Sequence, residues 1–210
     1  MENSPEVSQS VPGGSRKRRR VVLNSLLLFG ILGTGVWNSW AVPDGALKPG
    51  VKELSVARFA VEIYGAIASF YADYDTLPIA FSGADWVGST TGKHDLVAVL
   101  TAAQRPEVMQ SNPKKINYLD GFKQAKKDAS GKTIHGMDAV TDPLKPAIYD
   151  PWGQPFIVII DTNFDSMIAN PLKAGGALPI RGKKGIVYST GPPNADGTRN
   201  TDESKFIISW

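Results

Sequence analysis

Between Glu53 and Tyr74 the chain has the alternation of apolar and polar positions that is typical of an amphipathic α-helix. Apolar side chains recur with the helical period of 3.6 residues, at Val56, Phe59, Ala60, Ile63, Ile67, Phe70, Tyr71 and Tyr74. We expect the helix to end before Pro78, because proline disfavours the helical conformation in the residue before it. The polar face lacks the Lys and Arg enrichment of helices that lie on membranes. The helix is therefore expected to pack on a sheet, with Ile63, Ile67 and Phe70 in the core.

The last third of the chain contains three short segments that predict β-strands. They are rich in β-branched and aromatic residues and are bounded by turn-forming residues, at Phe156–Asp161, Gly185–Ser189 and Phe206–Trp210. A shorter helix is predicted over Leu96–Gln104, with Asp95 as its cap. Residues 105–150 are rich in turns, with room for a short strand or helix at Ile116–Phe122. One long early helix followed by antiparallel strands predicts an α+β fold in which the helix covers one face of the sheet.

The segment Asp150-Pro151-Trp152-Gly153 predicts a turn in front of the first of these strands. Pro151 suits the second position of a turn, and Gly153 permits a positive φ. Trp152 is expected to hold the helix against the strand, with ligand stacking as the alternative role.

The amino-terminal 40 residues predict a membrane segment. A basic run, Arg16–Arg20, precedes Val21–Trp40, which carries no charge and has the length of a membrane-spanning helix. We predict a cytoplasmic tail at 1–20, a transmembrane segment at 21–40, a linker at 41–51 and a globular domain at 52–210. The alternative is a cleaved signal, with Ser39-Trp40-Ala41 as the cleavage site, which would yield a secreted protein.

The charge distribution argues against nucleic-acid binding. Five of the 23 basic and two of the 20 acidic side chains lie within residues 1–20, which leaves 18 of each in residues 21–210. A nucleic-acid-binding surface needs a basic footprint that this balance does not supply. The absence of cysteine excludes disulfides, thiol catalysis and cysteine-based zinc sites.

Enzyme motifs are weak. The two histidines, His94 and His135, lie in turn-rich segments, and no Gly-x-Ser-x-Gly sequence occurs. Gly88–Lys93 has one residue too few between its glycines for a phosphate-binding loop. The sequence therefore predicts no catalytic residue, no bound organic cofactor and a non-enzymatic role.

Asp161, Asn163 and Asp165 match the first, third and fifth positions of a calcium-binding loop. Ser166 and Leu172 replace the glycine and the bidentate glutamate of that motif. These side chains predict either a calcium site or a turn in which Asp and Asn bond to their own backbone.

Six segments occur in a characteristic order along the chain: the predicted helix ARFAVEIYGAIASFYADYDTLP, Asn112–Leu119, Asp150–Phe156, Asp161–Asp165, Ser189–Pro192 and the final Ser209-Trp210. Together they resemble the type IV pilins and the major pseudopilins of type II secretion. The resemblance implies one long helix on a small antiparallel sheet. The amino terminus departs from it, because Gly13-Gly14 leads into a basic run and no Glu enters the apolar segment.

The resemblance also implies a calcium-binding loop before the last strand. In this chain the loop offers Asp196, Asp202 and Glu203 as oxygen ligands, while Lys205-Phe206 replaces an acidic pair. Trp210 is implied to be structural.

Two non-enzymatic functions are consistent with these features. The first is a structural or interaction subunit of a pilus-like or secretion-like apparatus, whose partners would be other such subunits or copies of itself. The second is a membrane-anchored binding protein, similar to an adhesin, that displays loops to an external protein or glycan. Shared architecture does not decide between them.

Overall fold

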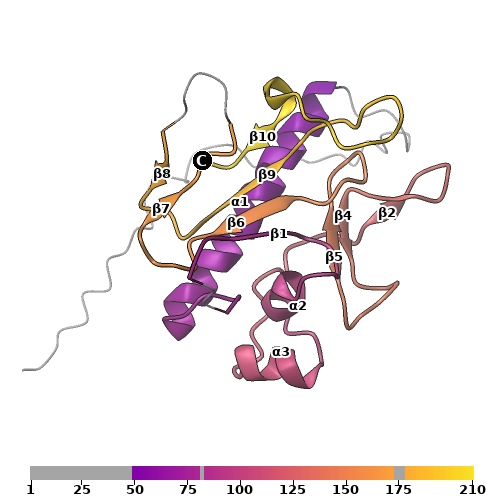
Figure 1. Cartoon of the computed structure of the whole chain (residues 1–210). Coiled ribbons are helices and arrows are strands. Elements are labelled where there is room, and N and C mark those ends of the chain that lie inside the picture. Colours follow the sequence, from indigo (N-terminus) through magenta and orange to yellow (C-terminus); the bar gives the residue numbers. More distant parts are fainter. Residues whose placement is uncertain (1–48, 81–82, 173–177) are drawn as a thin grey trace, which may run out of the picture. The chain divides into compact units, whose positions relative to one another are not determined.

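In the computed structural model, residues 49–80, 83–172 and 178–210 are described and form a mixed α+β fold (Figure 1). The predicted basic tail at 1–20, the predicted transmembrane segment at 21–40 and most of the predicted linker at 41–51 lie outside these residues. Within the described ranges, no helix is both long enough and apolar enough to cross a membrane.

The long helix α1 spans Pro49–Tyr74 and begins four residues before the predicted start. Proline fits the first helical position because the missing N–H has no helical partner there. The chain leaves the helix at Asp75, whose φ is +53° and whose N–H donates to the Tyr71 carbonyl at 2.8 Å. The predicted stripe is buried from Val56 to Phe70, with Ala66 as an additional member, whereas Tyr71 and Tyr74 are half-buried.

The central sheet has four antiparallel strands in the order β1-β6-β9-β10. Their bounds are Trp86–Ser89, Ile157–Ile160, Gly185–Ser189 and Ile207–Ile208. The prediction for Gly185–Ser189 is confirmed in full, while the other two predicted strands are shorter than expected. Strand β1 was not predicted, since Gly88 interrupts its pattern. A Cβ at Gly88 would lie 2.2 Å from the Trp86 ring, so a side chain at this position would displace that ring.

Helix α1 packs on β9 and β10 and lies behind the sheet in Figure 1. Because strand side chains alternate between faces, Val158, Ile160 and Val187 join the helix in the main core. The predicted arrangement of one long helix covering one face of a small antiparallel sheet is therefore confirmed.

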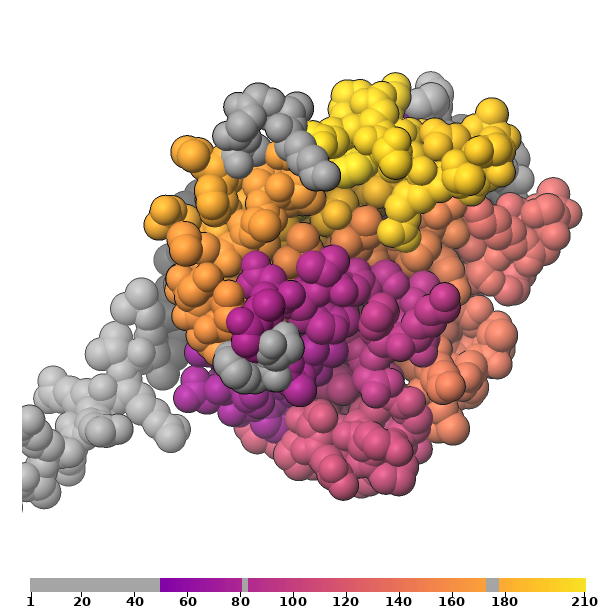
Figure 2. Space-filling view, viewed as in Figure 1, coloured from indigo at the N-terminus to yellow at the C-terminus, as the bar shows by residue number. Residues whose placement is uncertain are grey.

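The opposite face of the sheet is buried as well, which the sequence did not predict. Ile159, Ile186 and Tyr188 form a second cluster with Ile168 and with half-buried residues that include Trp210. Ile168 and Ile180 come from the two-stranded sheet of β7 (Met167–Ile168) and β8 (Ile180–Arg181). The short helix η1, Glu203–Lys205, precedes β10. The orange and yellow atoms of Figure 2 show these late segments over the upper part of the molecule.

Residues 96–149 are more regular than predicted. Helix α2 covers only Leu96–Leu100, and Asp95 makes no cap hydrogen bond but pairs with Arg105. The helix stops early because Ala102 is left-handed, with φ +54°. A further helix, α3, spans Pro106–Ser111, whereas Ile116–Phe122 forms turns. Two small hairpins follow, β2–β3 (Lys126–Lys127, Thr133–Ile134) and β4–β5 (Gly136–Asp138, Ala147–Tyr149).

The turn predicted at Asp150–Gly153 is present and is organised by a buried carboxylate. The Gly153 N–H donates to the Asp150 carbonyl at 3.0 Å, and Gly153 has φ +70°. The Asp150 side chain accepts from Trp152 N at 2.9 Å, Gln154 N at 2.8 Å and Ser189 Oγ at 2.6 Å. Trp152 is half-buried against the main core. Burial raises the pKa of Asp150, and the hydrogen bonds from Ser189, Gln154 and Trp152 lower it by less. Asp150 thus connects this turn to the central strand β9.

A half-buried histidine contacts the core beside this turn. The His135 ring lies against Phe59 with 5.2 Å between the ring centroids, and its Nδ1 is buried without a hydrogen-bond partner. Burial, together with the positive charges of Lys126 and Lys123, lowers the pKa of His135. The charged imidazolium is therefore less favourable in the folded chain than in the unfolded chain.

This lowered pKa predicts a loss of stability on acidification. As pH falls below the ordinary histidine value of 6.5, the unfolded chain binds a proton that the folded chain does not, so the free energy of unfolding decreases. His135→Asn, which tolerates the left-handed φ of +51° at this position, should flatten the pH profile between 6.5 and the folded-state pKa. Urea unfolding at a series of pH values measures this slope. His94→Asn serves as the control, and an equal flattening in both variants would contradict the assignment.

Candidate metal centre

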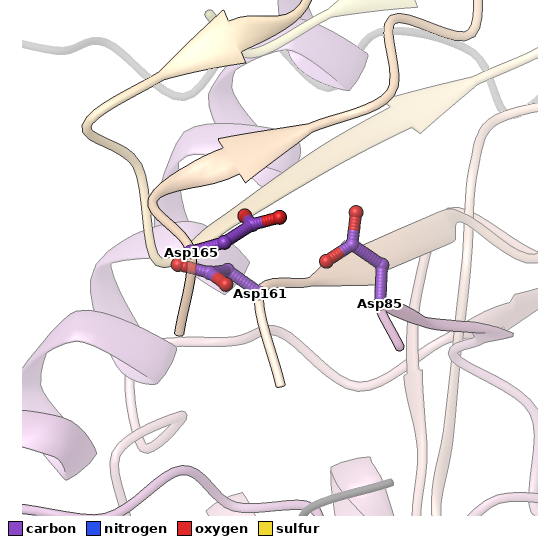
Figure 3. A group of neighbouring side chains, drawn as sticks. All are labelled: Asp85, Asp161 and Asp165. Atoms are coloured by element: carbon purple, nitrogen blue, oxygen red, sulfur yellow. The ribbon is translucent and has the colours of Figure 1, made fainter. Parts of the chain in front are cut away.

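Three carboxylates meet where strands β1 and β6 lie side by side. In this antiparallel pair Trp86 is opposite Ile160, so Asp85, just before β1, and Asp161, just after β6, lie at the same end. Asp165 returns to this point through the loop that leads to β7. Each of the three residues offers one ligand oxygen, and these oxygens all lie within 4.8 Å of one another. Figure 3 shows the carboxylates of Asp85 and Asp165 turned toward each other, with Asp161 beside Asp165.

The loop from Asp161 to Ser166 is fixed by its own hydrogen bonds. Asp161 Oδ2 accepts from Ser166 N at 3.2 Å, and Asn163 Oδ1 accepts from Asp165 N at 3.1 Å. Phe164 and Ser166 are left-handed, with φ +59° and +62°, a region that non-glycine residues rarely adopt. Thr162 Oγ1 donates to the Ala84 carbonyl and so connects the loop to the residue before Asp85. These contacts order the loop that carries Asp161 and Asp165 and connect it to the residue before Asp85.

The cluster concentrates negative charge without a basic partner. Asp161 is fully buried, and its Oδ1 has no hydrogen-bond partner; the buried Oδ1 of Asp85 also lacks one. Burial raises the pKa of Asp85, the charges of Asp165 and Asp161 raise it further, and a hydrogen bond from the Ala169 backbone lowers it. Within the described ranges, no lysine or arginine forms an ion pair with any of the three. The nearby Lys184 ammonium lies instead over the rings of Tyr71 and Phe164, at 5.0 and 5.2 Å.

The structure brings together two of the three residues in the predicted calcium loop. Asp161 and Asp165 join the cluster, whereas Asn163 bonds to Asp165 through both its oxygen and its amide nitrogen. Asp85 completes the group and was not predicted. The position of Asp85 in the sequence does not indicate a metal ligand, because Asp85 comes close to Asp161 only through the register between β1 and β6.

The second predicted site, Asp196, Asp202 and Glu203, is not assembled as a cluster in the described structure. Asp196 is exposed and accepts from Thr198 N at 2.9 Å and Thr198 Oγ1 at 2.6 Å. Asp202 caps η1 by accepting from Ser204 N at 3.0 Å and Ser204 Oγ at 2.7 Å. These hydrogen bonds lower the pKa of both carboxyl groups, and in each aspartate they engage Oδ1 within its own turn.

The remaining candidate residues have structural contacts. His94 packs edge-on against Trp86 at 5.3 Å, and His135 against Phe59. Gly88 belongs to β1, and the next helix, α2, begins only at Leu96. The segment Gly88–Lys93 therefore does not lead directly into a helix, as a phosphate-binding loop does. Ile63, Ile67 and Phe70 are buried in the main core, Pro151 is buried in its turn, and Trp210 contacts Tyr188 edge-on at 6.0 Å.

Comparison with known proteins found no match to this chain among family models, curated proteins or solved structures.

Proposed function

We propose that this chain is a non-enzymatic, pilin-like structural or interaction subunit of a pilus-like or type II secretion-like apparatus in a bacterial cell envelope. Residues 21–40 would anchor it in the inner membrane, with the described domain on the outer side. Its partners would be other pilin-like subunits or copies of the same chain. The proposal rests on a stripe of exposed apolar side chains on the face of α1 that points away from the sheet.

This outer stripe consists of Val51, Leu54 and Val61, whose exposed fractions are 46%, 72% and 55%. They are spaced three and seven residues apart, which places them along one side of the helix. The sheet does not cover this side, because the residues that contact the core lie on the opposite one. A helix with apolar side chains on both faces is suited to packing between its own sheet and a neighbouring subunit.

A second function is supported by a different surface. The loop between β4 and β5 exposes Val140 and Leu144, at 73% and 46%. Exposed apolar side chains on a loop are typical of surfaces that recognise another molecule. A membrane-anchored binding protein would use this loop to contact an external protein or glycan.

Single cysteines can separate the two functions, because the natural sequence contains none. Val61→Cys and Leu144→Cys would be introduced separately into the full chain, expressed in a bacterial envelope, labelled with a maleimide–benzophenone reagent and irradiated. The maleimide attaches to the introduced thiol, and the excited benzophenone then inserts into a C–H bond of any neighbouring molecule. If the chain is an apparatus subunit, Val61→Cys gives crosslinks to itself or to other helix-led subunits, and Leu144→Cys gives none.

The reverse pattern, with crosslinks only from Leu144→Cys to an external molecule, would favour the binding protein. Crosslinking from neither position would contradict both functions. Fractionation of the same cells measures the anchor: the full chain should sediment with membranes, and a chain without residues 1–45 should not.

A further inference from the structure

The acidic cluster described above contains a buried group whose bonding is incomplete. Asp161 has no exposed surface, yet its Oδ1 meets no donor. A buried carboxylate oxygen without a partner is costly, because it has lost water and gained nothing in return. The other oxygen, Oδ2, accepts from Ser166 N at 3.2 Å, and one carboxylate oxygen of Asp161 lies within 4.8 Å of those offered by Asp85 and Asp165.

The neighbouring groups increase this cost. Asp85 and Asp165 each bring a further carboxylate within 4.8 Å, and Asp85 Oδ1 is also buried without a partner. Like charges at such distances disfavour one another. No cationic side chain among the described residues forms an ion pair with them. A bound cation would satisfy both free oxygens and the charge together.

We propose that Asp85, Asp161 and Asp165 bind a Ca²⁺ ion. The donors are all carboxylate oxygens, which suit hard cations, and the cluster contains no histidine or cysteine that would select zinc or copper. Two oxygens on one ion can be no farther apart than twice the metal–oxygen distance. This limit is about 4.6–5.2 Å for Ca²⁺ and about 4.2 Å for Mg²⁺, so a span of up to 4.8 Å fits calcium.

Water can complete the coordination, because Asp165 is exposed and Asp85 is only partly buried. The ion would connect the residue before β1, the end of β6 and the loop that leads to β7. It would therefore fasten an outer strand of the sheet and the β7–β8 hairpin to the same point. This site is independent of the function proposed above and of the Asp196–Glu203 loop.

The site can be tested on the purified full chain, kept in detergent for its apolar amino-terminal segment and stripped of metal with a chelator. We expect Ca²⁺ to raise the thermal unfolding midpoint and to bind with a dissociation constant of about 10⁻⁴ M, typical of extracellular calcium modules. Asp161→Asn and Asp85→Asn should each weaken Ca²⁺ binding at least tenfold by calorimetry. Terbium luminescence excited through tryptophan provides a second readout, because Trp86 adjoins Asp85.

Two comparisons separate a metal ligand from a purely structural residue. Without metal, Asp85→Asn should melt at the same temperature as the natural protein or higher, because one of three repelling charges is removed; a lower midpoint would indicate a structural role and overturn the proposal. The double variant Asp196→Asn/Asp202→Asn should bind Ca²⁺ as the natural protein does. Loss of Ca²⁺ binding in this double variant would also overturn the proposal. So would the absence of any response of the natural protein to about 10 mM Ca²⁺, a concentration tenfold above the dissociation constant of the weakest class of such sites.

Discussion

Replacing Asp150 with alanine is expected to lower the free energy of unfolding by about 3–5 kcal/mol. The substitution removes the acceptor of three hydrogen bonds, from Trp152 N, Gln154 N and Ser189 Oγ. A buried donor left without a partner costs about 1–3 kcal/mol, and Asp150 itself is fully buried. Chemical denaturation followed by tryptophan fluorescence would measure the change.

The chain supplies a matched control for this prediction. Asp128 also accepts three hydrogen bonds, from Ser130 N, Lys132 N and Ser130 Oγ. As at Asp150, the donors are the backbone N–H groups two and four residues later and a serine hydroxyl. The loop of Asp128 is open to solvent, so water can replace the lost acceptor. Asp128→Ala should therefore unfold close to the natural protein. Equal destabilisation of the two variants would show that burial at Asp150 is not the cause.

Introducing a charge at Ile67 is expected to have an effect of at least similar size. Ile67 has no exposed surface in the core between α1 and the sheet. An aspartate there would be buried without a partner, and we expect a loss of about 4 kcal/mol or more, enough to unfold part of the population. Circular dichroism at increasing temperature would detect both the lower midpoint and the reduced helix content.

The control for Ile67→Asp lies on the same helix. Val61 is 55% exposed, so Val61→Asp should change the free energy of unfolding of the monomer by about 0.5 kcal/mol or less, as surface substitutions usually do. If Ile67→Asp melted like Val61→Asp, the buried stripe would not be the core of this fold.

The sequence predicted the elements whose pattern is long or purely local. The stripe from Val56 to Phe70 identified α1, because several helical turns repeat the same apolar spacing. Gly185–Ser189 identified β9, because five consecutive residues with strand propensity lie between turn formers. The turn at Asp150–Gly153 followed from proline and glycine chemistry alone.

The features that were missed depend on contacts between distant segments. Strand β1 contains Gly88 because the Trp86 ring needs the space, and no local pattern shows this. The second buried face arises because the β7–β8 hairpin and the residues around β10 cover Ile159 and Ile186. Asp85 reaches Asp161 only through strand register. Asp95, expected to cap α2, pairs with Arg105 ten residues later.

The candidate metal centre was therefore predicted only in part from the sequence. Asp161 and Asp165 could be recognised from their spacing within one loop. The third carboxylate and the unpartnered oxygen of Asp161 belong to the folded arrangement. By contrast, Asp196, Asp202 and Glu203 do not converge on one point among the described residues, and this absence of convergence distinguishes their loop from the cluster.

The dimensions of the outer strands limit how this molecule can associate. One edge strand of the sheet, β10, is two residues long, and the other, β1, has four residues, one of which is a glycine. Such short edge strands are poor templates for β-augmentation, in which a foreign chain extends the sheet by main-chain pairing. Among the described residues, the edges of this sheet therefore favour association through side-chain surfaces over the cross-β polymerisation that long open edges invite.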